Sequence, residues 1–273
     1  MTETTQIIEK SRPGKFLIFS ASVLLFFASC VQNNKKNNGS KNETPLSSQT
    51  EYLQVDSASL AYVDTAMLEE IAPYKAYVDS VMNKQLAFSD REIFKKKPNG
   101  LLNNLSADMV LEQTRKQLGK VEYYPDFCLL NYGGLRHPLP KGVITLSDIY
   151  QLMPFSNEVV VLKLSGLQVD SLFRYVAATG GQPLAGCTVE IKDGNFVQAF
   201  IGGKKFDKNK DYYVLTSDYL ANGGDRMSFF KHPEAIYKTG LLLRNAMIDY
   251  VKERGERGEH IVADPAERIK IIE

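Results

Sequence analysis

Apolar residues recur at helical spacing over two stretches in the first half of the chain. Between residues 60 and 82 they stand at 67, 68, 71, 74, 78, 81 and 82. This spacing predicts one helix, with Pro73 as its start, a kink or a break. A second helix is expected from about Asn104 to Leu118, and Gly119 is expected to end it.

Two short polar motifs indicate further helix starts. Ser165 to Gln168 fits a capping box, in which the first and fourth residues satisfy each other's backbone N–H groups, ahead of an apolar helical face. Thr145 to Asp148 is a variant of the same motif. A last amphipathic helix is predicted over residues 239–254.

Short apolar or alternating runs predict strands between these helices. The run Phe127 to Leu130 is continuous and apolar, which is typical of a buried strand, and it leads into a glycine-containing loop. Alternation on both sides of Asp193-Gly194 indicates a hairpin over residues 188–201. Further strands are expected at residues 159–164, 212–216 and 268–272. This order of elements predicts one layered domain of mixed α/β (α+β) fold.

The first thirty residues have the features of an export signal. Basic residues stand at 10, 12 and 15, and residues 16–28 are apolar over a length too short to span a bilayer comfortably. Ala28 and Ser29 precede Cys30, which resembles a bacterial lipobox whose cysteine is lipidated and becomes the mature N-terminus. We therefore expect a lipoprotein signal at residues 1–30. The alternative is a simple signal peptide with an incidental cysteine.

The next segment has the composition of a tether. From residue 31 to about 50 it consists of Asn, Lys, Ser, Gln and Gly with almost no apolar residues, so burial cannot offset the entropy of ordering. We expect a disordered tether at residues 31–58 and a folded domain at residues 59–273. With 273 residues, of which 44% are hydrophobic, the chain can bury one good core.

Charge and cysteine content narrow the set of partners. The formal net charge is +1, so no field over the whole chain attracts nucleic acid or an acidic membrane surface, and no nucleic-acid partner is expected. Cys128 and Cys187 each lie in a strand-like apolar run. Two buried thiols are the favoured interpretation, although an oxidising compartment would allow them to pair.

Three blocks of sequence occur together in a distinctive order. They are Asn131-Tyr-Gly-Gly-Leu-Arg136, Met153-Pro-Phe-Ser-Asn157 with Lys163-Leu-Ser-Gly-Leu after it, and Ser217-Asp-Tyr-Leu-Ala-Asn-Gly-Gly-Asp225. In order and spacing they resemble the C-terminal, nucleotide-recognition domain of the 5'-nucleotidase and UDP-sugar hydrolase family. A weaker block at residues 102–108 resembles the opening helix of that domain, and the resemblance covers about residues 60–273.

The loop from Asn131 to Arg136 is the first part of the predicted site. Considered alone it is more often a simple turn, because Asn and Gly tolerate positive φ. The resemblance implies that Asn131 and Arg136 contact the nucleotide. Backbone amides around Gly133 and Gly134, together with the guanidinium, can hold a phosphate or a carboxylate.

Two aromatic residues and a carboxylate form the second part. Phe155 and Tyr219 are, considered alone, more often core residues, but both stand beside turns. The resemblance implies that a base stacks between them, with Tyr219 where Phe is common. It also implies that Asp225 accepts the ribose hydroxyls, although a carboxylate in such a loop also caps turns. The expected substrate-binding set is completed by Asn222, Gly224 and, from a looser alignment, Gly186.

No catalytic residue and no metal ligand is expected in this chain. Hydrolysis in the family belongs to an N-terminal domain with two metals, held by Asp-x-His, Gly-Asn-His and Gly-His-x-His motifs. The histidines here stand singly, at 137, 232 and 260, and none lies in such a motif. We therefore expect no cofactor in this chain and two divalent metals in a partner.

One departure from the family concerns charge. Many relatives place an arginine just before the opening helix, where this chain has Lys95 to Pro98. Lysine would contact phosphate without the planar fork of a guanidinium, so this contact would be weaker or differently aimed. A solvated run of charge is the other interpretation.

The resemblance leads to a function hypothesis. The chain would be the nucleotide-recognition subunit of a split 5'-nucleotidase in nucleotide catabolism, with a separate metallophosphatase chain as partner. The alternatives are a nucleotide- or nucleoside-binding lipoprotein without a catalytic partner and a scaffold whose site has decayed, although the intact site residues argue against decay. The expected location is a bacterial cell envelope, with a lipid anchor in the membrane and the domain facing the periplasm or the surface.

Overall fold

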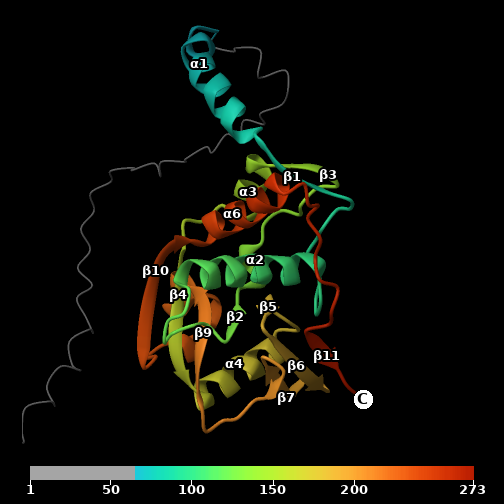
Figure 1. Cartoon of the computed structure of the whole chain (residues 1–273), viewed down its shortest axis with the longest axis vertical. Coiled ribbons are helices and arrows are strands. Elements are labelled where there is room, and N and C mark those ends of the chain that lie inside the picture. The colour runs from blue at the N-terminus through green and yellow to red at the C-terminus, as the bar shows by residue number, and fades with distance from the viewer. Residues whose placement is uncertain (1–64) are drawn as a thin grey trace, which may run out of the picture. The chain divides into compact units, whose positions relative to one another are not determined.

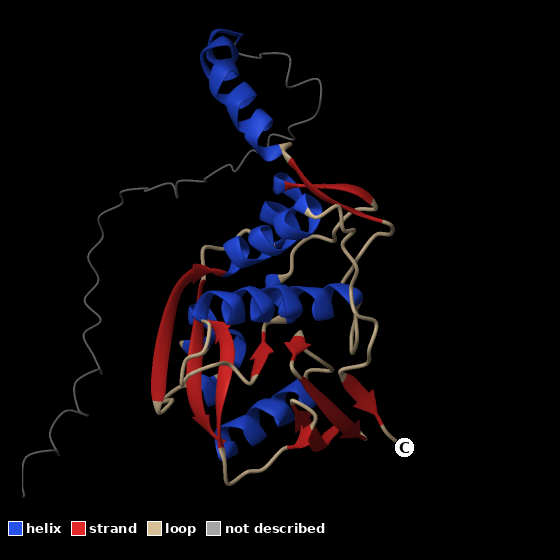
Figure 2. Ribbon diagram, viewed as in Figure 1, coloured by secondary structure: helices blue, strands red, loops and turns tan. Residues whose placement is uncertain are grey.

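The computed structural model describes residues 65–273 of the chain. The predicted export signal, Cys30 and the predicted tether lie outside these residues. Helices and strands alternate along the described part, which forms several sheets with helices packed on them (Figures 1 and 2). Within residues 65–273, each helix is too short or too polar to cross a membrane.

A five-stranded sheet lies between the two groups of buried residues that form the cores (Figure 1). Strand β4 is antiparallel to both of its neighbours, β10 and β9. Strand β2 is parallel to β9 and antiparallel to β5. In spatial order the strands are β10 (Ala235–Leu242), β4 (Glu158–Ser165), β9 (Asp211–Ser217), β2 (Phe127–Leu129) and β5 (Leu184–Ala185).

The two faces of this sheet pack into two separate cores. On β4, Val159 and Val161 enter one core, while Val160, Leu162 and Leu164 enter the other. Because successive side chains on a strand point to opposite faces, a strand buried on both faces is a continuous apolar run. The first face is covered by α2 (Leu101–Leu118), α3 (Leu146–Leu152) and α6 (Leu243–Glu256), and the second by α4 (Gly166–Ala178).

Two smaller sheets and several short helices complete the fold. The second core extends to a four-stranded sheet of β11 (Ile269–Ile271), β6 (Cys187–Lys192), β7 (Asn195–Ile201) and β8 (Lys204–Lys205). A two-stranded sheet joins β1 (Gln85–Ser89) and β3 (Gly142–Thr145). The short helices are η2 (Tyr132–Gly134), α5 (Asp218–Ala221), η3 (Gly224–Arg226) and η4 (Ser228–Phe230).

The helix signals in the sequence are confirmed with small shifts at the ends. Thr145 and Ser165 each form a reciprocal capping box with the residue three positions later. Helix α2 begins at Leu101, earlier than predicted, and ends at Gly119, whose φ of 64° suits a glycine. Helix α1 (Thr65–Met82) contains Pro73, and none of its residues is buried.

The predicted helix over residues 239–254 began too early. Residues Ala235–Leu242 form strand β10, which pairs with β4, and α6 starts only at Leu243. Gly240 has a φ of 71°, which a right-handed helix excludes. Thr239 donates its hydroxyl to the carbonyl of Val159 at 2.7 Å. Pairing with a strand far away in sequence therefore overrides the local helical spacing.

Both cysteines of the described part are free thiols inside the cores. Cys128 belongs to the first core and Cys187 to the second. Burial raises the pKa of the Cys187 thiol to about 12 and raises the pKa of Cys128 well above its ordinary value. Both groups are therefore uncharged at neutral pH and pack as small apolar side chains.

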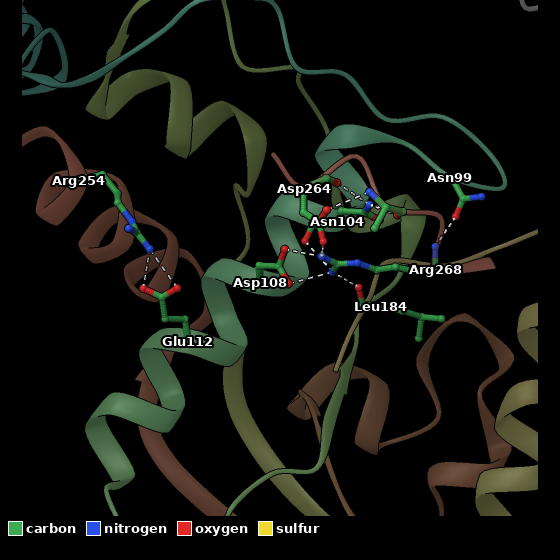
Figure 3. Close-up of polar contacts among 9 residues, drawn as sticks. Asn99, Asn104, Asp108, Glu112, Leu184, Arg254, Asp264 and Arg268 are labelled. Carbon is green, nitrogen blue, oxygen red and sulfur yellow. Dashed lines mark hydrogen bonds and ion pairs between the residues drawn. The ribbon is translucent and has the colours of Figure 1, made fainter. Parts of the chain in front are cut away.

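A buried ion pair joins the segment before β11 to helix α2 (Figure 3). Arg268 donates to both carboxylate oxygens of Asp108, at 2.9 and 2.6 Å, and its side chain is only 10% exposed. The same guanidinium donates to the carbonyls of Leu184 and Asn104, and it also bonds to Asp264. Burial raises the pKa of the Asp108 carboxyl, and its bonds to Arg268 oppose this rise.

Replacing Arg268 should destabilise the domain strongly. In Arg268→Met the free energy of unfolding should fall by about 3 kcal/mol, because the Asp108 carboxylate loses its counter-charge in a partly buried position. Denaturant unfolding measures this loss. The matched control is Arg254→Met, since Arg254 also bonds to two carboxylates, those of Glu112 and Glu259, but these three side chains are more exposed, at 29%, 49% and 43%. The control should lose less than about 1 kcal/mol, and equal losses in the two variants would contradict the prediction.

Candidate functional site

Three loops, one after β2, one before β4 and one after β9, lie at the same end of the strands of the five-stranded sheet (Figure 1). Because β2 and β9 are parallel and β4 is antiparallel to β9, the ends of β2 and β9 lie at the same edge as the start of β4. Asn131 follows β2, Phe155 precedes β4, and Tyr219 follows β9. Strand direction alone therefore places three predicted site residues at a common edge, which is a usual position for ligands.

The carboxylate of Asp225 is the centre of the contacts between these loops. Asn131 donates its side-chain amide to one oxygen at 2.7 Å, and the Tyr219 hydroxyl donates to the other at 2.8 Å. A third donor, the hydroxyl of Tyr175, bonds to the main-chain carbonyl of Asp225 at 2.8 Å. The bond to the Asp225 carboxylate raises the pKa of the Tyr219 phenol, so this hydroxyl keeps its proton at neutral pH.

The two predicted stacking residues are exposed rings. Phe155 is 40% exposed and Tyr219 is 44% exposed, so neither is a core residue. The guanidinium of Arg136 lies 5.9 Å from the centre of the Phe155 ring, and Arg136 also donates to the carbonyl of Gly133 at 3.3 Å. These contacts connect the loop after β2 with the loop before β4.

Two glycines are required by the close approach of site side chains. A Cβ at position 134 would lie 2.7 Å from the side-chain oxygen of Asn131. A Cβ at position 224 would lie 2.5 Å from the ring of Tyr219. Gly133 differs, because its Cβ would make an ordinary contact of 3.7 Å with Asp225. The glycines of both motifs thus keep Asn131 and Tyr219 close to the backbone.

The sequence matches a known family over the region that contains these loops. Residues 83–232 match the family model of the 5'-nucleotidase, C-terminal domain, and this stretch is more than half of the chain. The chain belongs to the 5'-nucleotidase C-terminal domain family. The predicted resemblance and the predicted mixed α/β fold are both confirmed.

The proteins that are similar in sequence to this chain are much longer. A 5'-nucleotidase of Vibrio parahaemolyticus is 26% identical over 200 residues, which cover 69% of this chain and 34% of that protein. Protein UshA of Escherichia coli is 26% identical over 133 residues, covering 47% of this chain and 24% of UshA. A crystal structure of a 5'-nucleotidase precursor from Thermus thermophilus aligns with a TM-score of 0.64 at 23% identity, covering 79% of this chain and 45% of that one. This chain thus spans about a third or less of these two sequence relatives.

Two cationic residues that were not predicted as site residues bond to the loops of this 5'-nucleotidase-family domain. Lys95 donates its ammonium group to the carbonyls of Leu135 at 2.6 Å and Tyr132 at 3.3 Å. Arg244 donates to the carbonyls of Met153 and Phe155, both at 3.3 Å. Burial, and next the charge of Arg136, lower the pKa of Lys95. In the sequence, Lys95 belongs to a run that was interpreted either as a phosphate contact or as solvated charge, and Arg244 has no local motif.

Two predicted site residues do not join the cluster around Asp225. Gly186 follows β5 with a φ of 79°, and its Cβ would lie 2.8 Å from the carbonyl of Asp126, just before the start of β2. It therefore lies at the opposite end of β2 from Asn131. Asn222 ends helix α5 and donates its side-chain amide to the carbonyl of Asp218 at 2.9 Å. A ligand role for either residue stays a prediction.

Acidic, histidine and cysteine side chains do not gather in the described part of this domain. Across residues 65–273 there is no group of three or more such residues that could hold a metal ion. His137 bonds through its ring to the carbonyl of Pro138, and His260 bonds to Asp90. The arrangement around Asp225 instead offers a carboxylate, a guanidinium, a side-chain amide and two exposed rings, which is a set suited to holding a polar ligand with a flat ring.

Proposed function

We propose that this chain recognises nucleosides and nucleotides as the substrate-binding subunit of a split 5'-nucleotidase. The observation that carries this proposal is the placement of two exposed rings, Phe155 and Tyr219, at the same strand edge as the Asp225 carboxylate. The names of several relatives, which are 5'-nucleotidases, also support the proposal.

Each group of the site then has a role that matches its chemistry. The rings of Phe155 and Tyr219 stack on the base, which every base permits because each has a π-face. The Asp225 carboxylate accepts from the ribose hydroxyls, since among residues 65–273 each of its oxygens takes one side-chain donor and keeps lone pairs free. Arg136 and the backbone amides after Asn131 hold the phosphate.

Hydrolysis is assigned to a separate metallophosphatase chain in this proposal. The present chain spans about a third of the length of its 5'-nucleotidase relative from Vibrio, and its three histidines stand singly in the sequence. A two-metal centre needs several histidines and carboxylates that converge on the scissile phosphate. Binding of the base and ribose here would position the phosphate for that centre.

The same proposal places the protein on a membrane of the bacterial cell envelope. The basic residues at 10, 12 and 15, the apolar run at 16–28 and the pair Ala28-Ser29 before Cys30 support a lipidated N-terminal cysteine. The domain would face the periplasm or the cell surface.

Loss of one stacking ring should weaken nucleoside binding without unfolding the protein. In Phe155→Leu the affinity for adenosine and AMP should fall by about 1 to 3 kcal/mol, because a π-face is removed from an exposed position. Calorimetric titration beside thermal melts measures both quantities. Phe88→Leu is the matched control, since Phe88 on β1 is 38% exposed and belongs to another sheet. Unchanged affinity in a well-folded Phe155→Leu protein would refute the nucleotide site.

The purified chain should bind nucleotides and still release no phosphate from AMP. The reason is that its residues supply recognition and not a two-metal centre. Phosphate release is measured with manganese or zinc, with and without a chelator. Metal-dependent release by the rigorously pure chain would overturn the split-enzyme proposal. Nucleotide binding with no phosphatase chain co-purifying from the source cells would instead favour a non-catalytic binding lipoprotein.

Membrane attachment should depend on Cys30 alone. Cys30→Ser should give an unlipidated protein that partitions into the aqueous phase, because the lipid chains on that residue supply the attachment. Labelling with a radioactive fatty acid and detergent phase partitioning measure the two effects. Cys128→Ser is the control for loss of a thiol, and it should keep the lipid label. Label that persists in Cys30→Ser would show that the lipobox interpretation is wrong.

A further inference from the structure

We propose that Lys95, Tyr175 and Arg244 are positioning residues that hold the three loops of the site in their binding form. The proposal rests on the proposed function for the identity of the ligand. Each side chain comes from outside the three loops and donates to a main-chain carbonyl within one of them. Carbonyls in loops lack partners from helices and sheets, so a long donor side chain can fix the path of the backbone.

Tyr175 holds the turn that carries Asp225. Asp225 and the next residue, Arg226, have φ values of 51° and 63°, in the left-handed region that side chains other than glycine rarely adopt. Tyr175 lies on α4, which packs on the second core, and its hydroxyl donates to the Asp225 carbonyl at 2.8 Å. Its ring also packs against Phe229, with 5.5 Å between centroids. The turn is thereby fixed to the scaffold at the residue that presents the carboxylate.

Arg244 holds the loop that carries Phe155. It lies in the first turn of α6, and one of its nitrogens donates to the carbonyls of both Met153 and Phe155. Its guanidinium stacks on the ring of Tyr150, 4.2 Å from the centroid, which fixes the direction of the side chain. The exposed ring of Phe155 therefore stands on a backbone that is bonded to helix α6, one face of which packs on the first core.

Lys95 holds the loop that carries Asn131 and Arg136. Its ammonium group bonds to the carbonyls of Leu135 and Tyr132 and lies 4.5 Å from the centroid of the Tyr132 ring. Two of its three protons are thus used inside the protein. Lys95 acts on the ligand through the loop that presents Arg136, which differs from the direct phosphate contact that the family resemblance implied.

The three contacts start from different elements and end on different loops. Loss of one contact should therefore affect only the part of the ligand that its loop holds. Tyr175 controls the ribose hydroxyls through Asp225, Arg244 controls the base through Phe155, and Lys95 controls the phosphate through Arg136. For Tyr175 and Lys95, a general loss of stability would not produce this pattern, because it would weaken binding of every ligand equally. All three ligands used below share the base that the Phe155 loop holds, so for Arg244 an unchanged thermal melt and the control variant make this distinction.

The chain offers a matched control for each variant. Tyr175→Phe is paired with Tyr212→Phe, because the Tyr212 hydroxyl donates to a turn carbonyl at the other end of β9. Arg244→Met is paired with Arg254→Met. Arg254 also lies on α6 and its guanidinium also stacks on a tyrosine ring, that of Tyr250. Lys95→Met is paired with Lys116→Met, because the Lys116 ammonium group also bonds within the protein, to the Glu253 carboxylate of α6, away from the three loops.

The experiment is calorimetric titration of the full-length protein in detergent with adenosine, 2',3'-dideoxyadenosine and AMP. Tyr175→Phe should weaken adenosine binding about three- to tenfold and leave the dideoxy analogue nearly unchanged. Lys95→Met should weaken AMP about three- to tenfold more than adenosine, and Arg244→Met should weaken all three ligands by a similar factor. Each control variant should stay within about twofold of the unmodified protein. Thermal melts of all six variants verify folding, and Arg244→Lys replaces Arg244→Met if the latter does not fold.

The possible outcomes separate the two proposals. Failure of the unmodified protein to bind all three ligands would overturn the proposed function, and this inference with it. Binding by the unmodified protein with no ligand-specific losses, or with the same losses in variants and controls, would overturn this inference alone. The three distinct patterns of loss would support it.

Discussion

The guanidinium of Arg268 bonds to groups from α2, from β5 and from the segment before β11 (Figure 3). Apolar packing between these elements is non-directional and would tolerate small slips. Hydrogen bonds to two carboxylates and two carbonyls have fixed directions, so they set how α2, the five-stranded sheet and the four-stranded sheet meet. Asn99 adds to this junction by accepting the backbone N–H groups of Arg268 and Ile269. Strand β5 pairs with β2, and β2 leads into the Asn131 loop. The junction therefore also helps to set the position of that loop.

The site itself is a product of strand direction. The chain enters β4 and leaves β2 and β9 at one edge, which brings residues from distant parts of the sequence within hydrogen-bonding distance. None of the three loops belongs to the sheet, and side-chain donors from neighbouring elements add to the few main-chain bonds of their backbones. The turn that carries Asp225 also needs support from its surroundings, because its left-handed backbone conformation is costly. The candidate site is thus built on loops that bond to the scaffold behind them.

Local signals in the sequence predicted local features well. The capping boxes at Thr145 and Ser165 and the end of α2 at Gly119 lie where expected, because each involves groups only a few residues apart. Strand β10 was missed, because it exists by pairing with β4 across some seventy residues of chain. The glycine-rich motifs marked the loops of Asn131 and Asp225, whose side chains the structure joins.

Other parts of the site had no signal that a single sequence could reveal. Tyr175 and Arg244 lie on ordinary amphipathic helices, and only the three-dimensional structure shows that they reach the loops. Gly186 packs closely against the carbonyl of Asp126 and Asn222 ends a helix, and a ligand role for either residue stays a prediction.

The wide separation of the contacting residues has a consequence for how the protein acquires its site. Asn131 and Asp225 are 94 positions apart, and Arg268 and Asp108 are 160 positions apart. Contacts of such long range form late, because closing the intervening loops costs entropy before the contacts compensate for it. A nascent chain that ends before residue 225 has the Asn131 loop but lacks the carboxylate that orients it. The candidate site would therefore be complete only when the domain has finished folding, so the proposed binding would belong to the native protein and not to an incompletely folded molecule.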